Sequence, residues 1–161
     1  MADIRASRVR LKMPWLGEVE LKVDDRSKEA AWKLYVELAT RVAIVPLGTG
    51  EGRLREAMNS LYEVFAVTRG VLKEAGPRVG GSRNSVGGIA MRVLDRGLRP
   101  FLSKWHPRLA EWESRGQDRG GALQREADWG REAECRRELL EVQGRMKMYC
   151  RMLARIAGVN Q

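Results

Sequence analysis

An arginine and a histidine late in the chain have the spacing and the chemistry of a candidate active site. Arg99 and His106 are separated by six residues. In a helix of ~3.6 residues per turn, seven steps return nearly to the same face, so both side chains can point the same way. A histidine, with its reference pKa of about 6.5, suits acid–base catalysis, and an arginine can stabilise charge on a phosphate. The pair could therefore combine acid–base catalysis at His106 with charge stabilisation at Arg99.

This spacing resembles the motif of HEPN ribonucleases, helical bundles that pair two such motifs across a dimer. The match covers the eight residues from Arg99 to His106. It departs from the family at Pro100, where a polar residue usually follows the arginine. The resemblance implies an RNA-cleaving enzyme. The interpretation that we favour is a structural histidine, which caps its helix ahead of Pro107 or hydrogen-bonds within its own bundle.

A surplus of basic residues predicts an affinity for polyanions. The formal net charge is +9, and no acid follows Glu141. On helices, Arg92, Arg96 and Arg99 would share one face, and so would Arg151 and Arg155. Such ridges can follow a phosphate backbone. The candidate nucleic-acid-binding residues are Arg83, Arg92, Arg96, Arg99, Lys104, Arg108, Arg145, Lys147, Arg151 and Arg155.

The alternative for these residues is the solvated outer face of a bundle, which we favour slightly. Aromatic side chains would strengthen a nucleic-acid site, but most of them fall on stripes that the sequence predicts to be buried. The basic ridges therefore predict nucleic-acid binding only as the second function class.

Other kinds of site find little support. The glycine-rich segment from Gly80 to Gly88 lacks the lysine and the preceding strand of a phosphate-binding loop, so a connector is expected there. One histidine and two separate cysteines do not make a metal site. Cys135 and Cys150 would lie over ~20 Å apart on one helix, too far for a disulfide. The sequence predicts no metal site and no bound cofactor.

Two alternating segments predict an N-terminal β-hairpin. Residues 8–13 and 18–23 alternate polar and apolar side chains, and residues 14–17 form the turn between them. A two-stranded ribbon is marginal by itself, so it must lie on the helices or pair its edge with another chain. Its dry face consists of Val9, Leu11, Met13, Val19, Leu21 and Val23.

Apolar residues at three- and four-residue steps predict four helices behind the hairpin. The expected ranges are about 25–45, 53–75, 85–113 and 122–157. The fold class is mainly α, a four-helix-bundle-like domain with an N-terminal β-hairpin. The whole chain of 161 residues suits a single domain, with the hairpin in 1–24 and the bundle in 25–161.

Particular residues define the helical faces and their interruptions. The first helix is expected to bury Trp32 and Val36, and the second to bury Tyr62. Pro100 predicts a kink or a break near Arg96, because proline lacks a backbone N–H. The last helix carries a heptad seam made of Cys135, Leu139, Val142, Met146, Tyr149, Leu153 and Ile156.

The sequence also predicts a cytoplasmic protein. No apolar run approaches the ~20 residues of a membrane span, and no signal peptide is recognisable. Reduced, buried cysteines suit the same compartment.

Three stretches together resemble a group of bacterial proteins. They are residues 32–41, residues 60–62 with 68–69, and residues 99–106. Their order and spacing are similar to uncharacterised helical proteins encoded in bacterial conflict clusters, beside caspase-like peptidases and large NTPases. The resemblance implies an accessory or adaptor role in anti-phage defence, and it carries over no catalytic residue.

The leading hypothesis is therefore a non-enzymatic interaction module of such an assembly. We expect a protein partner or self-association, with the hairpin edge and the heptad seam as contact candidates. Nucleic-acid binding is the second hypothesis, and RNA cleavage by Arg99 and His106 is the third.

Overall fold

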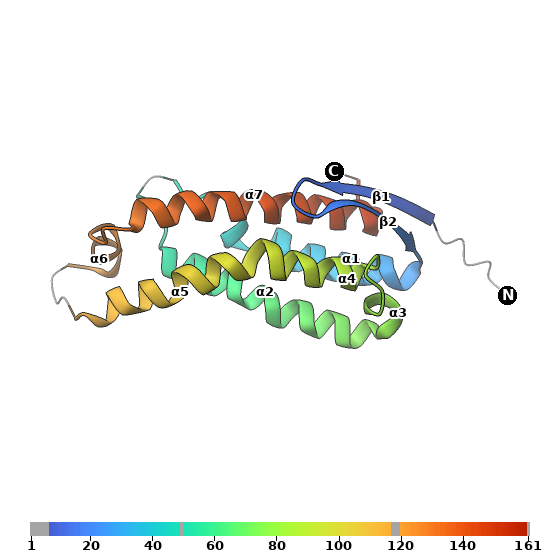
Figure 1. Cartoon of the computed structure of the whole chain (residues 1–161), viewed down its shortest axis with the longest axis horizontal. Coiled ribbons are helices and arrows are strands. Elements are labelled where there is room, and N and C mark those ends of the chain that lie inside the picture. Colours follow the sequence, from blue (N-terminus) through green and yellow to red (C-terminus); the bar gives the residue numbers. More distant parts are fainter. Residues whose placement is uncertain (1–6, 49, 117–119, 161) are drawn as a thin grey trace.

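The computed structural model describes residues 7–48, 50–116 and 120–160, without the side chain of Val42. It confirms the predicted class, a mainly α domain behind an N-terminal β-hairpin (Figure 1). The elements are β1 Ser7–Met13, β2 Gly17–Val23, α1 Asp25–Ala39, the 3₁₀ turn η1 Val42–Ile44, α2 Leu54–Ala75, α3 Pro77–Gly80, α4 Val86–Val93, the π-helical segment η2 Leu94–Leu98, α5 Arg99–Ser114, α6 Ala122–Ala127 and α7 Glu132–Ala157.

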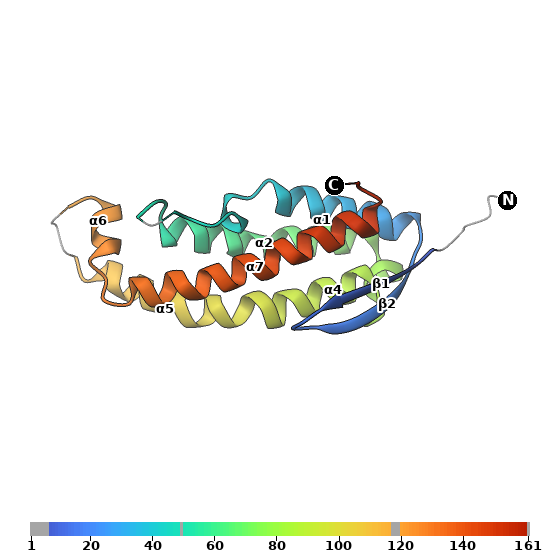
Figure 2. The ribbon, with the colours of Figure 1, turned by 90° about the horizontal axis from the view of Figure 1, so that it is seen from above.

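Four long helical segments lie side by side along an elongated molecule (Figures 1 and 2). They are α1, α2, the continuous helix α4–η2–α5, and α7. Helix α1 packs against α7 and α2, and α5 packs against α2 and α7, so the four surround one core. No described helix is long and apolar enough to cross a membrane.

The hairpin folds onto its own bundle. Strands β1 and β2 pair antiparallel from Ser7 opposite Val23 to Met13 opposite Gly17. The predicted dry face lies in the core, apart from Val9, which is partly buried. Trp15 in the turn lies close to Gly97, because a Cβ added to Gly97 would lie 3.0 Å from the Trp15 ring. Of the two predicted arrangements, the hairpin adopts the one in which it lies on the helices, so its dry face is covered by its own bundle.

Helix α1 is shorter than predicted and buries a different face. It begins after Asp24, whose carboxylate accepts a hydrogen bond from the Ser27 N–H at 2.8 Å. It ends at Ala39 rather than near residue 45. At this end, the Thr40 hydroxyl donates to the Val36 carbonyl at 2.7 Å. Trp32 and Val36 are 48% and 38% exposed, so their predicted burial is wrong. The buried residues are the smaller or aliphatic Ser27, Ala30, Ala31, Leu34 and Leu38.

The third helix is not broken at its prolines but changes its winding. The Arg99 N–H bonds to the Leu94 carbonyl, five residues back, in the π-helical segment just before Pro100. Pro100 cannot donate to the Arg96 carbonyl, and a wider turn accommodates that missing bond. The interruption predicted near Arg96 therefore appears as this segment. Pro107 lies inside α5, which continues to Ser114, so it does not end the helix.

The last predicted helix is two helices. α6 ends at Ala127 and α7 begins at Glu132, with Trp129 and Gly130 in the turn between them. Trp129 is buried and packs edge-on against Trp105, with ring centroids 5.8 Å apart. Burial of this indole supports the turn that the sequence did not predict. The heptad seam of α7 is confirmed, because all seven of its residues are buried.

Candidate functional site

Arg99 and His106 lie in one open cleft between α2 and α5, with a volume of about 520 Å³. Seven steps of one helix separate them, and both side chains face α2. The lining residues are Tyr62, Phe65 and Arg69 from α2, and Arg99, Leu102, Ser103, His106 and Pro107 from α5. The structure thus brings together the two predicted catalytic candidates and adds Tyr62 and Arg69.

The π-helical segment decides where Arg99 points. In a regular α-helix, Arg99 would share a face with Arg92 and Arg96, as predicted. The extra residue per turn in η2 rotates the positions that follow it. Arg99 accordingly lies over the Phe65 ring of α2, with 5.2 Å from its guanidinium carbon to the ring centroid. Neither Arg92 nor Arg96 lines the cleft.

Arg99 keeps its charge accessible. Its Nε donates to Asp95 at 2.9 Å, and both side chains of this pair are about 60% exposed (59% and 62%). An ion pair so exposed contributes about 0–1 kcal/mol and exchanges readily with another anion. Arg69 is exposed and has no ion pair among the described residues. Two guanidinium groups are therefore available to an anion in the cleft.

His106 stacks on Tyr62 at the other end of the cleft. Their ring centroids are 5.8 Å apart, and His106 is half-buried. Because α5 continues beyond it, His106 caps no helix end, and that part of the prediction is wrong. No hydrogen bond to its imidazole occurs within the described part of the chain. Tyr62, predicted to be buried, is 60% exposed, so an aromatic face borders the basic cleft.

Lys104 and Arg108, also predicted to bind nucleic acid, point elsewhere. The Lys104 ammonium contacts Glu138 at 2.5 Å and Glu134 at 3.4 Å on α7. The hydrogen bond to Glu138 raises the pKa of Lys104, and the same bond lowers the pKa of Glu138. Arg108 donates to the Lys104 carbonyl. Lys104 is thus neutralised by the fold.

The remaining predicted residues form two further groups. Arg83, Arg92 and Arg96 lie around the start of the α4–η2 helix, where Arg92 donates to the Arg83 carbonyl at 2.9 Å. On α7, Lys147, Arg151 and Arg155 are exposed and Arg145 is half-buried, all without an ion pair among the described residues. The ten candidates therefore belong to separate surfaces and not to one.

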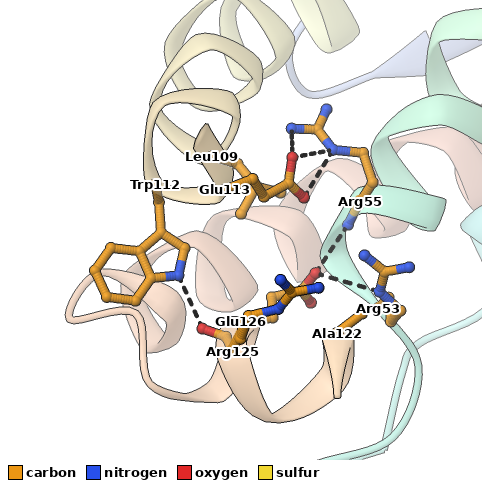
Figure 3. Close-up of a pocket in the computed structure, with 8 residues that line it drawn as sticks. All are labelled: Arg53, Arg55, Leu109, Trp112, Glu113, Ala122, Arg125 and Glu126. Atoms are coloured by element: carbon orange, nitrogen blue, oxygen red, sulfur yellow. Dashed lines mark hydrogen bonds and ion pairs between the residues drawn. The ribbon is translucent and has the colours of Figure 1, made fainter. Parts of the chain in front are cut away.

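A second pocket, of about 260 Å³, lies where α6 meets α2 and α5 (Figure 3). The Glu126 carboxylate, only 3% exposed, accepts hydrogen bonds from the Leu54 and Arg55 N–H groups at the start of α2. The Arg55 side chain donates to the Glu113 carboxylate at 2.8 Å, and the Trp112 indole donates to the Arg125 carbonyl at 2.8 Å. Sequence reasoning missed this arrangement, because it depends on the unexpected turn after α6.

The charges around this second pocket are already matched. Glu126 satisfies backbone donors at a helix N-terminus, where a negative charge is favoured. Arg53 and Arg136 approach the same carboxylate at 4.0 Å. The pocket therefore holds α6 against α2, and the α2–α5 cleft remains the better candidate for a ligand.

The two cysteines show no sign of reactivity. Both are buried and free. Burial raises the pKa of Cys135 to about 12 and also raises that of Cys150, so neither forms a thiolate near neutral pH. Among the described residues, no group of three metal-ligating side chains converges.

In comparisons with known proteins, no family model, no curated protein and no solved structure matches this chain.

Proposed function

We propose that the protein binds single-stranded nucleic acid in the α2–α5 cleft. The observation that carries this proposal is the meeting of Arg69 and Arg99 with the exposed face of Tyr62 in one cleft. Arginine recognises phosphate through its fork of donors, and aromatic rings provide platforms for unpaired bases. The cleft therefore offers both interactions that a single strand requires.

Exposure of Tyr62 weakens the main argument against nucleic acid. That argument assumed that the aromatic residues beside the basic positions were buried. Tyr62 instead presents 60% of its surface to solvent, next to His106 and one helical turn from Phe65. Bases in a duplex are stacked on each other and cannot reach such a ring, so an unpaired base is the expected occupant.

Binding is tested by fluorescence anisotropy with a labelled single strand of about 12 nucleotides, within the range of known site sizes. The double variant Arg69→Gln/Arg99→Gln should weaken binding strongly and reduce the salt dependence by about two ions. The matched control is Arg8→Gln/Arg115→Gln, which removes the same charge from exposed arginines outside the cleft. Equal weakening by both double variants would show only a general effect of charge.

Cleavage of the bound RNA is a second outcome of the same experiment. Ser103 and His106 follow Arg99 by one and two helical turns within the cleft, and His106 has no structural hydrogen bond among the described residues. In a cleaving enzyme, His106 would accept the proton of a ribose 2′-hydroxyl while Arg99 holds the phosphate. The 2′-oxygen would bond to phosphorus and form a 2′,3′-cyclic phosphate, the bond from phosphorus to the 5′-oxygen would break, and the leaving 5′-oxygen would take a proton from water. An RNA strand cut by the parent protein but intact with His106→Ala would favour this activity over binding alone.

The adaptor role in a bacterial defence assembly remains a prediction, and one observation favours a protein contact. Trp32 and Val36 on α1, Val45 after it, and Leu140 and Met148 on α7 are exposed apolar side chains on two helices that pack together. Lys147 and Arg151 lie on the same helix as Leu140, with no acid after Glu141. An acidic amphipathic helix of a partner is the occupant that complements this surface, since a second copy would bring its own basic ridge.

A photo-crosslinking residue at Trp32 tests the protein contact in the native host. The expected product is one partner whose cross-linked peptide is an acidic amphipathic segment. A product made of two copies of this chain, or no product, would contradict the proposed occupant.

A further inference from the structure

Three arginines gather where the turn at residues 81–85 packs against the start of α4. The Arg92 Nη2 donates to the Arg83 carbonyl at 2.9 Å, so the Arg92 side chain lies along that turn. Arg96 follows Arg92 by four residues, one helical turn further on. The hydrogen bond to Arg83 and the one-turn spacing to Arg96 bring the three arginines together, and the charges of Arg83 and Arg96 both act on Arg92.

No carboxylate of the described residues forms an ion pair with this group of arginines. Among the described residues, neither Arg83, Arg92 nor Arg96 takes part in an ion pair. Elsewhere in the molecule, half-buried arginines such as Arg41 and Arg55 contact a glutamate at 2.8 Å. Burial, followed by the charges of Arg83 and Arg96, lowers the pKa of Arg92, a sign that its surroundings disfavour the cation. A bound anion would offset the repulsion from Arg83 and Arg96 and would favour the charged form of Arg92.

One donor of Arg92 is also unused. Its Nε is buried and has no hydrogen-bond partner in the described part of the chain. Buried polar groups in folded proteins nearly always have partners, so an orphaned donor beside two further guanidinium groups indicates where an acceptor belongs. The fork of an arginine matches the oxygens of a phosphate group.

Two glycines allow the turn at residues 81–85 to pack closely against α4. A Cβ on Gly88 would lie 2.1 Å from the Ser82 carbonyl oxygen, and one on Gly87 would lie 2.5 Å from the Gly80 Cα. The turn can therefore pack directly on α4 only because both residues lack side chains. This contact explains why residues 87 and 88 are glycines, and the same turn carries the Arg83 carbonyl that accepts the Arg92 hydrogen bond.

We propose that Arg83, Arg92 and Arg96 form a binding site for a phosphate group. The shared chemistry is a phosphate oxyanion, either free phosphate or a phosphodiester of nucleic acid. The site consists of residues outside the α2–α5 cleft, so it stands whether or not that cleft binds a single strand. If both are occupied by one strand, the α4–η2–α5 helix supplies contacts at two places along it.

Two-dimensional NMR of the arginine Nε–H groups tests the site, with inorganic phosphate and a dinucleoside monophosphate as separate probes. Saturable shifts of the Arg92 signal with inorganic phosphate alone would assign free phosphate. Shifts with the dinucleotide would assign a phosphodiester. The absence of a saturable shift with either probe would overturn the proposal.

Matched variants locate the binding. Arg96→Gln changes an exposed residue, so the fold should persist, and it should weaken phosphate binding about tenfold, as expected for one charge-assisted contact. Arg155→Gln removes another exposed arginine, on α7, that has no ion pair among the described residues, and it should leave binding unchanged. Equal weakening by both variants would overturn the site. The Arg69→Gln/Arg99→Gln variant should retain the Arg92 shift, which separates this site from the cleft.

Discussion

Two regions of the molecule use arginine and lysine in opposite ways. Where α6 meets the end of α5 and the start of α7, basic side chains meet carboxylates, as Arg55 meets Glu113 and Arg131 meets Glu134 at 2.8 and 2.9 Å. In the α2–α5 cleft and around α4, Arg69 and Arg92 have no such partner within the described chain. A net charge of +9 therefore conceals two populations, one that builds the fold and one that remains available to a ligand.

This contrast changes the weight of individual candidates. Lys104 belongs to the paired population through Glu134 and Glu138 on α7. Arg99 lies five residues earlier on the same helix and is available, because its Asp95 contact is exposed. Sequence counts treat these residues alike, whereas the neighbouring helix decides their roles.

The largest expected effect is unfolding of the whole domain, which would remove both regions at once. Leu139 is 2% exposed in the α7 seam, so Leu139→Asp places an unpaired charge in the core. We expect a loss of roughly 3–5 kcal/mol in the free energy of unfolding, enough to unfold a marginal domain. Circular dichroism during urea denaturation measures it. Leu140→Asp, at a neighbouring position that is 50% exposed, is the control and should leave the midpoint nearly unchanged.

A smaller effect, on single-strand binding, should distinguish the available basic residues from the paired ones. Arg99→Gln should weaken single-strand binding about tenfold, because it removes one charge-assisted phosphate contact. Lys104→Gln removes the same charge nearby but should leave binding within about twofold, because Glu138 already neutralises that ammonium. Anisotropy titrations of both variants at one salt concentration make the comparison. Equal losses would erase the proposed distinction between them.

The paired end should respond through stability. Glu126→Gln keeps the size of the side chain but removes the buried negative charge from the start of α2 and from beside Arg53 and Arg136. We expect a loss of about 1–3 kcal/mol in the free energy of unfolding, as for other buried hydrogen bonds to charged groups. Denaturant melts measure it, and nucleic-acid binding by the folded variant should be unchanged. A variant as stable as the parent would contradict the structural role of Glu126.

Regular patterns were predictable from the sequence, because they repeat over many residues. The α7 seam and the alternating hairpin strands each specify one buried face, and both are confirmed. In α1, the predicted face was wrong because large apolar residues were assumed to be buried. Ala30 and Ala31 instead allow close packing, which leaves Trp32 outside.

The candidate site was predictable only in part. The spacing of Arg99 and His106 indicated a common side of one helix, but Arg69 and the exposed ring of Tyr62 depend on how α2 packs against α5. Both residues stood in the stretches of the family resemblance, which assigned them no role. The spacing of apolar residues could not predict the rotation at η2, because Pro100 indicated an interruption of the helix but not its form.

The smallest expected effect concerns the pH dependence of the paired end. Hydrogen bonds from Lys104 and then from Trp105 hold the pKa of Glu138 below its ordinary value of 4.5. A carboxylate with a lowered pKa in the folded state stabilises the fold above its ordinary pKa, and this contribution is lost as the pH falls through the folded-state pKa. Stability should therefore decline below about pH 4.5 in the parent, and less steeply in Glu138→Gln. Urea melts across this range measure the difference, with the exposed Glu141→Gln as the control. Because ion pairs near the surface contribute about 0–1 kcal/mol and both side chains of this pair are partly exposed, the difference should be modest. Identical pH profiles for the parent and Glu138→Gln would show that the Lys104 pair adds nothing to stability.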